Sequence, residues 1–402
     1  MKFVIMIIAL IAERKKSADN RVALTPVQCV ALQQKFPEIK VIVESSSHRC
    51  INDEAYTSVG IPVLEDVSEA DILFGIKEVP SEYLIPNKTY FFFSHTIKKQ
   101  PYNRQMLKDL VANNIRLIDY EVLKWETGQR VLGFGRWAGI IGAYNGLRLF
   151  GLKHKIFDLK PAWTCVNFAE VLRGALEIKI PPVKMIVTGG GRVSNGSIDF
   201  LRNIRVKEVT PKQFIEDQYN EPVFVHLNSP DLYGHNDLKE WNSEYFYTHH
   251  SEYKSLFEPY TRVADILFNG IFWTKDLPPL FSIEQASLAS FKMTTIADIS
   301  CDVNGSVPLT YKATTIKEPF ISWNRVKKQP GELFENGNID IMAVDNLPNE
   351  LPEDASNEFG GMLMNSVIPE LLKPHSDLLN RATICESQKL TEHFSYLTDF
   401  IG

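Results

Sequence analysis

The first third of the chain alternates short apolar runs with segments of helical spacing. The apolar runs, each about the length of a strand, cover residues 3–12, 38–45, 71–77, 89–95 and 115–121. Between the first two runs, Thr25 followed by Pro26 is typical of a helix N-terminus, and helical spacing continues from Val27 to Gln34. Strands separated by helices favour parallel pairing, so this pattern predicts an α/β domain.

A second set of strand-like runs lies further along the chain. They cover residues 183–190, 206–210, 222–228, 263–270, 294–300 and 339–345, and a helical pattern at 138–152 precedes them. At 354–372 we predict an amphipathic helix, with Phe359, Met362, Leu363 and Val367 on one face. We predict no strand after this helix and expect it to return to the first domain. Because 402 residues exceed the usual size of one core, two α/β domains are expected.

Composition narrows the classes of function. The net charge of −6 and the lack of a basic, aromatic-rich stretch argue against a nucleic-acid binder. The five cysteines form no CxxC pair and the histidines show no metal-binding spacing, so neither a disulfide framework nor a metal site is predicted. The run at 3–12 lacks a clear cleavage site and is too short to span a membrane. We therefore expect a buried strand in a cytoplasmic protein, with a secretory signal as the alternative.

Three glycines, Gly189, Gly190 and Gly191, close the run at 183–190, and Gly196 follows within a helical pattern. Glycines are needed where a strand turns sharply into a helix whose N-terminus approaches a pyrophosphate. The spacing is two residues longer than the common dinucleotide fingerprint, so a tight turn without a ligand is the alternative. The next run ends at Thr210, with no carboxylate where the ribose of NAD would be bound, so NAD and NADP both stay open.

Lys77, His95 and Glu121 each end an apolar run of the first domain. In an open parallel sheet, ligands bind beyond the carboxyl ends of the strands, so these side chains are expected to converge on one edge. Taken singly, they have simpler interpretations: a solvated lysine, a hydrogen-bonded core histidine and a helix-capping carboxylate. Arg21 and Arg130 could hold carboxylates through their planar forks, although each alone is typical of a solvated surface residue.

Seven segments of the chain together resemble one enzyme family. They are residues 91–100, 115–121, 128–139, 188–196, 267–273, 297–306 and 344–356, in the family's order. They are similar to the lysine-2-oxoglutarate reductase domain of bifunctional aminoadipic semialdehyde synthase and, more distantly, to the fungal lysine-forming saccharopine dehydrogenases. Both belong to the alanine dehydrogenase and transhydrogenase superfamily. The resemblance implies two Rossmann-like domains with the active site in the cleft between them: a substrate domain of residues 1–137 plus 352–402, and a dinucleotide-binding domain of residues 138–351.

The resemblance also implies roles for individual residues. Lys77 would accept a proton and His95 would donate one. The substrate would be bound by Arg21, Arg130, Phe134 and Glu121. The cofactor, NAD or NADP, would lie along Gly189, Gly191, Arg192, Thr210, Phe272, Ile299, Val344, Asp345, Asn346 and Leu347. The fungal enzymes have Asp where this chain has Thr210, and the animal-type enzyme is NADP-linked, so the choice of cofactor stays open.

The implied activity is the reversible NAD(P)-dependent cleavage of saccharopine to L-lysine and 2-oxoglutarate. Its partners would be these small molecules, with no nucleic acid and no membrane, and the superfamily leaves a monomer or a homo-oligomer open. The reaction needs a neutral amine, so Lys77 must have a pKa below the roughly 10.4 of a free lysine, which Glu78 and Glu121 would oppose if ionised nearby. Two alternatives remain: an amino-acid dehydrogenase acting on alanine, and a non-catalytic NAD-binding subunit like that of transhydrogenase. The sequence does not reveal the physiological direction.

Overall fold

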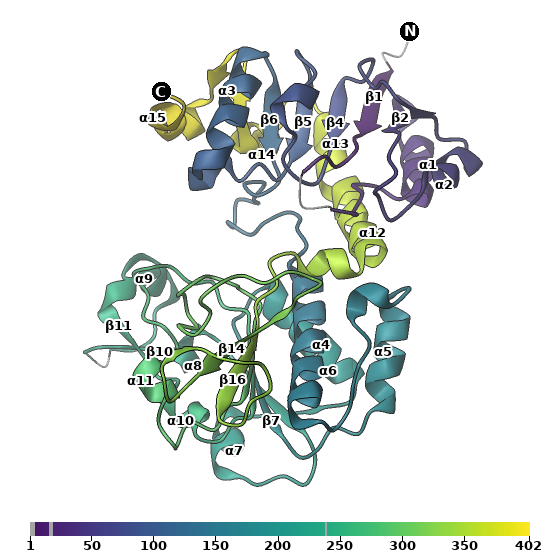
Figure 1. Ribbon diagram of the computed structural model, residues 1–402. Helices are drawn as coiled ribbons and strands as arrows, with labels where there is room; N and C mark the ends of the chain where they lie inside the picture. The colour runs from purple at the N-terminus through teal and green to yellow at the C-terminus, as the bar shows by residue number, and fades with distance from the viewer. Residues whose placement is uncertain (1–4, 16–18, 238) are drawn as a thin grey trace. The chain divides into compact units, whose positions relative to one another are not determined.

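The chain forms two compact units in this computed structural model, which describes residues 5–15, 19–237 and 239–402. Unit 1 contains the residues up to Phe134 together with Pro352–Gly402, and unit 2 contains Gly135–Leu351 (Figure 1). Each unit has its own 8-stranded, mostly parallel sheet, which confirms the predicted α/β class. The start of the first predicted strand, Phe3 and Val4, lies outside the described residues.

The sheet of unit 1 has the order β18-β17-β6-β5-β4-β1-β2-β3. Its strands are β1 (Met6–Leu10), β2 (Ile39–Glu44), β3 (Val63–Leu64), β4 (Ile72–Phe74), β5 (Thr89–Phe92), β6 (Arg116–Asp119), β17 (Thr383–Glu386) and β18 (Lys389–Leu390). The strands from β1 to β6 pair in parallel, whereas β17 pairs antiparallel with both β6 and β18. The prediction that no strand follows the C-terminal helix is therefore wrong. Strand β17 is only four residues long, and its Ile384 and Cys385 are buried because it extends the sheet beside β6.

The helices of unit 1 pack on this sheet. They are α1 (Pro26–Lys35), α2 (Asp53–Ser58), α3 (Arg104–Ala112), α12 (Pro352–Met362), α13 (Ile368–Leu371), α14 (Asp377–Ala382) and α15 (Thr398–Ile401). Thr25 caps α1 as predicted, because its side chain accepts from the backbone N–H of Gln28 while the Gln28 side chain accepts from that of Thr25. The predicted C-terminal helix is confirmed as α12 and α13, joined by a π-helical turn at Leu363–Val367.

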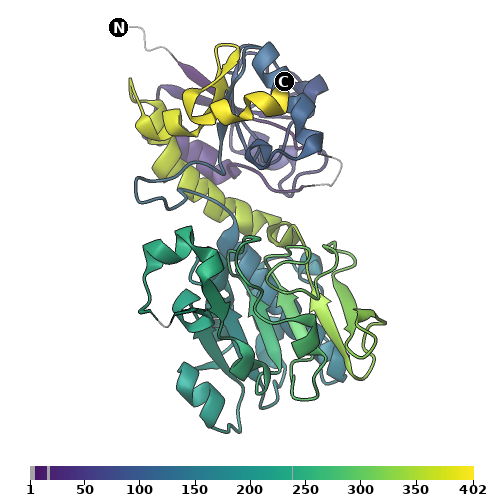
Figure 2. The ribbon, with the colours of Figure 1, turned by 90° about the vertical axis from the view of Figure 1, so that its left-hand side faces the viewer.

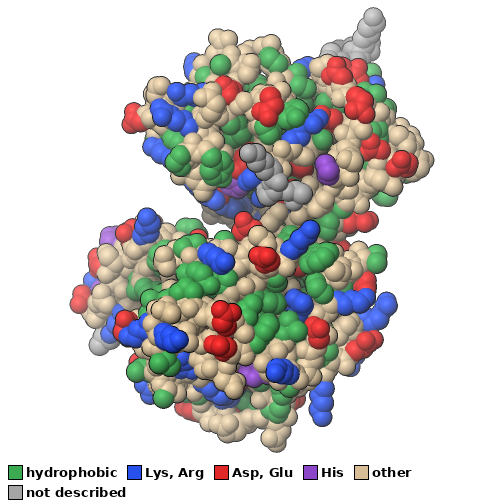
Figure 3. Space-filling view, viewed as in Figure 1, with side chains coloured by type: hydrophobic (Ala, Val, Ile, Leu, Met, Phe, Trp, Pro, Cys, Tyr) green, Lys and Arg blue, Asp and Glu red, His purple; other side chains and the backbone are tan. Residues whose placement is uncertain are grey.

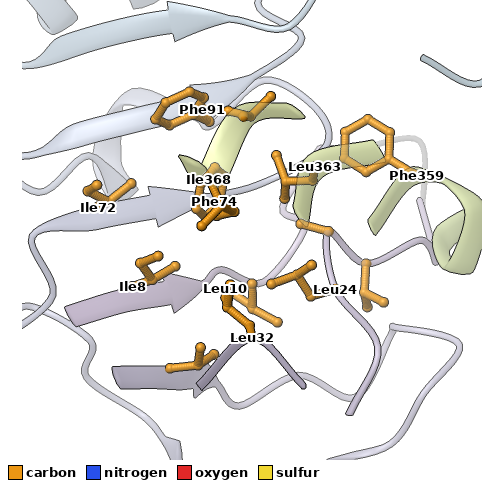
Figure 4. Close-up of a cluster of buried hydrophobic side chains, with 14 of the residues drawn as sticks. Ile8, Leu10, Leu24, Leu32, Ile72, Phe74, Phe91, Phe359, Leu363 and Ile368 are labelled. Carbon is orange, nitrogen blue, oxygen red and sulfur yellow. The ribbon is translucent and has the colours of Figure 1, made fainter. Parts of the chain in front are cut away.

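One buried cluster of unit 1 joins segments from opposite ends of the sequence (Figure 4). Figure 4 labels Ile8, Leu10, Leu24, Leu32, Ile72, Phe74, Phe91, Phe359, Leu363 and Ile368. The predicted apolar face of the C-terminal helix is confirmed, because Phe359, Leu363 and Val367 are fully buried and Met362 packs against the cluster. Burying each such side chain contributes about 1.5–3 kcal/mol, so this face holds Pro352–Gly402 within unit 1.

The sheet of unit 2 has the order β15-β14-β16-β13-β12-β7-β9-β8. Its strands are β7 (Lys184–Thr188), β8 (Lys207–Val209), β9 (Val223–Leu227), β12 (Ile266–Asn269), β13 (Thr295–Asp298), β14 (Phe320–Asn324), β15 (Gln329–Pro330) and β16 (Asn338–Met342). The six strands predicted from apolar runs are all present and pair in parallel. The antiparallel strands β14 and β15, and a hairpin of β10 (Tyr233–His235) with β11 (Tyr253–Ser255), were not predicted, because these runs are short and mix apolar with polar residues.

The longest helix of unit 2 is α4 (Gly135–His154), which packs closely on α6 (Arg192–Asn203) (Figures 1 and 2). The other helices are α5 (Phe168–Glu177), α7 (Pro211–Glu216), α8 (Ser229–Leu232), α9 (Ser243–Thr248), α10 (Glu258–Thr261) and α11 (Ile283–Ala286). The contact of α4 with α6 depends on glycine: a Cβ on Gly139 would lie 1.8 Å from the Val193 carbonyl oxygen, and one on Gly196 would lie 2.0 Å from that of Arg136. Gly196 therefore serves helix packing.

The surface charge, the lengths of the helices and the placement of His, Cys, Asp and Glu side chains bear on the class of function. On the face shown in Figure 3, side chains of both charge signs are interspersed over unit 2. No helix in the described ranges is long and apolar enough to cross a bilayer. Within those same ranges, no group of three or more His, Cys, Asp or Glu side chains is arranged to hold a metal ion.

Candidate functional site

The three ionisable residues singled out in the first domain follow neighbouring strands of unit 1. Lys77 comes just after β4, His95 just after β5 and Glu121 just after β6. These strands are adjacent and parallel, so their carboxyl ends lie at one edge of the sheet. The structure thus gathers at one edge three groups that are 44 residues apart at the extremes of the sequence.

His95 is paired with Glu78, a buried carboxylate. Nδ1 of His95 lies 2.7 Å from Oε1 of Glu78, and Nζ of Lys15 lies 3.0 Å from Oε2. Burial alone would raise the pKa of Glu78, but the hydrogen bond and charge of His95, together with Lys15, lower it to about 2. His95 also has a left-handed backbone (φ +52°), a conformation that non-glycine residues adopt mainly where their surroundings enforce it.

The amine of Lys77 has a different environment. In the part of the chain that the structure describes, its Nζ makes no hydrogen bond or ion pair. Burial lowers the pKa of Lys77, and the charge of Arg21 lowers it further, partly offset by Asp19. An amine with a lowered pKa and no partner is suited to accept a proton.

Glu13, which the sequence analysis did not single out, holds the backbone beside that amine. Its two carboxylate oxygens accept from the N–H groups of Ile76 (2.6 Å) and Lys77 (2.9 Å). Burial, and then the charge of Asp19, raise the pKa of Glu13 to about 8 despite these bonds. The signal was present in the sequence, since Glu13 follows the apolar run at 3–12 as Lys77 follows its own run.

Arg21 is buried and held from two sides. Its Nε donates to Oδ1 of Asp19 (2.9 Å) and its Nη2 to Oδ2 (2.5 Å), and its guanidinium lies 4.1 Å from the ring centroid of Phe134. That ring stacks on Phe359 at 4.6 Å. Burial opposes ionisation of Asp19, but the charge and hydrogen bonds of Arg21 hold its pKa well below the ordinary range. The solvated-surface interpretation of Arg21 is therefore wrong, and Asp19 is a second residue that the sequence analysis missed.

One carboxylate oxygen of Glu121 forms ion pairs with two cationic side chains. Nζ of Lys98 and Nη2 of Arg130 each lie 3.2 Å from its Oε1. Its other oxygen, Oε2, is buried and has no hydrogen-bond partner among the described residues. Because a buried, unpaired carboxylate oxygen is unfavourable, this atom is suited to receive a donor from a ligand.

Asp119, at the end of β6, ties two of these segments together. It is fully buried; its Oδ2 accepts from the backbone N–H of Ser94 (3.2 Å) and from the Ser94 hydroxyl, and its Oδ1 accepts from the N–H of Glu121 (2.7 Å). Burial raises the pKa of Asp119 to about 6 against these bonds.

In unit 2, the glycines after β7 form an open turn into α6. Gly189 has φ +102°, and a Cβ there would lie 2.8 Å from the Gly270 carbonyl oxygen. A Cβ on Gly191 would meet nothing within 4 Å, and this residue is the N-cap of α6 and has no side chain with which to cap the helix. The free N–H groups and the dipole of a 12-residue helix favour an anion at this point, so these residues fit a dinucleotide pyrophosphate.

The remaining residues assigned to the cofactor follow other strands of the same sheet. Thr210 follows β8 and caps α7, accepting from the N–H of Gln213 (3.3 Å). Phe272 is 74% exposed, whereas Ile299 is buried against Gly142 of α4. Val344 and Leu347 are buried, Asp345 is exposed, and Arg192 and Asn346 stand at the start of α6 and of a 3-10 turn.

Asp298 is the carboxylate of unit 2 that most resembles Asp119. It ends β13, is fully buried, and accepts from Thr310 Oγ1 (2.6 Å), Ser300 Oγ (2.7 Å) and Asn269 Nδ2 (2.8 Å). Burial raises its pKa to about 6 against these bonds. All of its bonds come from side chains within unit 2, so it stabilises the turns at the carboxyl edge of that sheet.

Comparison with known proteins agrees with the family suggested by the seven segments. The family model for the alanine dehydrogenase/PNT N-terminal domain matches residues 9–141. The chain is 28% identical to mitochondrial alpha-aminoadipic semialdehyde synthase of Bos taurus over 89% of its own length, but spans only 44% of that protein. It is 26% identical to the NAD(+)-dependent, L-lysine-forming saccharopine dehydrogenase of Yarrowia lipolytica, covering 88% of this chain and 89% of the relative.

Solved structures match the fold over nearly the whole chain. An L-alanine dehydrogenase aligns with a TM-score of 0.65 at 15% identity, covering 99% of this chain and all of the other. A transhydrogenase from Sinorhizobium meliloti aligns with a TM-score of 0.56 at 14% identity, covering 96% and 98%. At these identities the likeness establishes the arrangement of strands and helices.

Proposed function

We propose that this chain, which is similar to the lysine-forming saccharopine dehydrogenases and carries a match to the alanine dehydrogenase/PNT N-terminal domain, cleaves saccharopine reversibly to L-lysine and 2-oxoglutarate with NAD or NADP. The observation that carries the proposal is the amine of Lys77. It has a lowered pKa and no partner among the described side chains, at the sheet edge where the Glu78–His95 pair also lies. An oxidation at a secondary amine carbon requires such a base.

The cofactor would be held by unit 2. Gly189, Gly191 and Arg192 would bind the pyrophosphate, and Thr210 would lie near the adenosine ribose. Phe272, Ile299 and the segment Val344–Leu347 would line the rest of the dinucleotide. When bound, the nicotinamide takes a hydride from the substrate. Because the hydroxyl of Thr210 caps α7 and carries no charge, it neither selects NAD as a carboxylate would nor repels the 2′-phosphate of NADP.

The side chains of unit 1 would then handle protons. Lys77 would take the proton from the secondary amine of saccharopine, which must be neutral before its carbon can be oxidised. Glu78 accepts at Nδ1 of His95, which leaves Nε2 to exchange protons with the water that splits the resulting imine. Run in reverse, the same groups serve lysine and 2-oxoglutarate.

Substrate carboxylates and amines would be recognised by the charged groups around this edge. Arg130 is half exposed, its Nη2 lies 3.2 Å from Oε1 of Glu121, and its planar guanidinium is suited to a carboxylate of the substrate. Arg21, locked by Asp19 and Phe134, would present a fixed positive charge. The buried Oε2 of Glu121 would accept from a substrate amine.

The test is a pair of assays on the purified chain. Oxidation of NADH and of NADPH is measured with lysine plus 2-oxoglutarate, and separately with pyruvate plus ammonia. We expect turnover with the first pair and little with the second. Turnover with pyruvate and ammonia alone would replace the proposal by an alanine dehydrogenase activity. Nucleotide binding without turnover of either pair would leave only a binding subunit.

A further inference from the structure

The conformation of His95 needs a support outside its own loop. Its left-handed backbone places a residue with a Cβ in a region that is normally strained. The residues on both sides of it, Ser94 and Thr96, are fully buried and bonded to each other: Oγ of Ser94 lies 2.7 Å from Oγ1 of Thr96 and accepts from the backbone N–H of Thr96 (3.2 Å). What fixes Ser94 therefore fixes both neighbours of His95.

Asp119 provides that fixed point. Ser94 donates to it twice, from its N–H and from its hydroxyl, so the Ser94 oxygen keeps its lone pairs for Thr96. The second oxygen of Asp119 accepts from the N–H of Glu121, two residues further along its own chain segment. One carboxylate thus connects the loop after β5 to the loop after β6.

We propose that Asp119 is a positioning residue that holds His95 and Glu121 in register with each other. It acts through Ser94 and through the Glu121 backbone, and it touches neither substrate nor cofactor. The inference rests on the proposed function, since it takes His95 as the proton-exchanging group and Glu121 as a substrate contact. The charged or titratable side chains around Asp119 are Glu121, His95, Tyr120 and Tyr396.

The test variant is Asp119→Asn. Its amide has one accepting oxygen and one donating NH₂, so it can serve either Ser94 or Glu121 but not both. We expect kcat to fall roughly 100-fold, because a displacement of about 1 Å at the reacting groups has that effect. The KM for the dinucleotide should stay unchanged, since the residues that fit it belong to unit 2. Ser94→Ala, which removes one of the three bonds to Asp119 and both bonds of the Ser94 hydroxyl to Thr96, should lower kcat by about tenfold in the same way.

The matched control is Asp298→Asn, a buried strand-end aspartate of the other sheet with a pKa raised to a similar value. Hydrogen exchange, measured by mass spectrometry on peptides covering 93–97 and 120–123, gives a readout that needs no turnover. In Asp119→Asn these peptides should exchange at least about tenfold faster while the rest of unit 1 is unchanged; in Asp298→Asn they should not respond.

Each outcome decides the inference. Selective loss of protection together with a fall in kcat supports it. Unchanged exchange at 93–97 and 120–123, or an equal loss across the whole unit-1 sheet, overturns it, as does a change in dinucleotide KM with kcat retained. If the parent chain shows no turnover of lysine with 2-oxoglutarate, the proposed function fails while the exchange data still judge Asp119. Should Asp119→Asn not fold, Ser94→Ala carries the same comparison.

Discussion

The two sheets have the same size and the same parallel centre, yet their carboxyl edges carry different chemistry. After the strands of unit 1 come ionisable side chains, among them Lys77, His95 and Glu121, most of them paired. The corresponding edge of unit 2 has the glycines that follow β7, among them Gly189, and the hydrogen-bonded Asp298 that ends β13. A common architecture thus leaves the edge free to specialise, and we propose proton handling on the sheet of unit 1 and anion binding on that of unit 2.

The largest effect is expected from Lys77→Met, which removes the only group of the unit-1 edge proposed as a base. Turnover should fall by roughly 10³-fold, a loss typical of removing a general base. Dinucleotide affinity, measured by fluorescence titration, should be unchanged because the residues that we propose to bind the dinucleotide lie in unit 2. Unchanged turnover would refute the base assignment, and a loss of dinucleotide binding would break the division of roles between the two edges.

The next effect is on the stability of unit 2. Gly139→Ala places a Cβ 1.8 Å from the Val193 carbonyl oxygen, so α4 and α6 must separate, and unfolding free energy should fall by about 3 kcal/mol. Gly174→Ala in α5 is the control, since nothing lies within 4 Å of its Cβ; the better helix propensity should add about 0.5–1 kcal/mol. Urea unfolding measures both, and equal values would show that the helix contact is looser than described.

Two buried glutamates, Glu350 of unit 2 and Glu78 of unit 1, should contribute to stability with opposite dependence on pH. Burial raises the pKa of Glu350 in unit 2 from 4.5 to about 8, although Asn145 donates to it at 2.7 Å. The folded state binds this proton more tightly, so its stabilising contribution is complete below pH 4.5 and is lost as pH rises to about 8. The unfolding free energy of Glu350→Gln should therefore exceed that of the parent chain between pH 4.5 and about 8, by up to ~4 kcal/mol near pH 8.

Glu78 in unit 1 provides the opposite case for the same measurement. Its pKa is lowered to about 2, so its contribution is present above pH 4.5 and is lost as pH falls to about 2. The unfolding free energy of Glu78→Gln should fall furthest below that of the parent chain near neutral pH, and the two values should converge in acid. Unfolding free energies of both variants from acid to about pH 8.5 test the pair, and parallel curves would contradict the assignment.

The smallest effect compares two buried tyrosines within unit 1. The hydroxyl of Tyr120 is buried with no hydrogen-bond partner among the described residues, whereas that of Tyr56 donates to the Leu24 carbonyl at 2.8 Å. Tyr120→Phe should leave stability unchanged or raise it by up to ~1 kcal/mol, and Tyr56→Phe should lower it by about 1 kcal/mol. Thermal unfolding distinguishes them; an equal loss in both would mean that Tyr120 has a partner.

The parts of this fold that sequence predicts are those set by local periodicity. The parallel strands of both sheets, except the two-residue β3, and the C-terminal helix are predicted from strand-like or helical patterns, because most of these strands are buried and apolar. Strand β17 escapes the same analysis, since four residues carry too little pattern and only its neighbour β6 makes Ile384 a core residue. The prediction of a cofactor loop was weak because Gly196 lies two residues beyond its position in the common fingerprint, and in the structure this glycine serves helix packing.

For the candidate site, the sequence identified several of the ionisable residues but not the side chains and backbone groups that they contact. Lys77, His95 and Glu121 stand out in the sequence because each is an ionisable residue at the end of an apolar run. That Glu13 holds the Lys77 backbone, or that Asp119 holds Ser94, depends on contacts 64 and 25 residues apart in sequence, which no local pattern encodes. The lowered pKa of Lys77 also depends on the fold, because its causes are burial and then the charge of Arg21, which is distant in sequence.

Strand β17 has a consequence for how the protein behaves in a crowded solution. An uncovered β6 would present a row of unpaired amides and carbonyls, the template on which strands of other molecules add. Strand β17 occupies that position, and β18 follows it with Lys389 on the outermost strand, a charge that discourages further pairing. Strands β17 and β18 contain no proposed site residue, but they cover the edge of β6, the strand that ends at Asp119, and so discourage its pairing with other molecules.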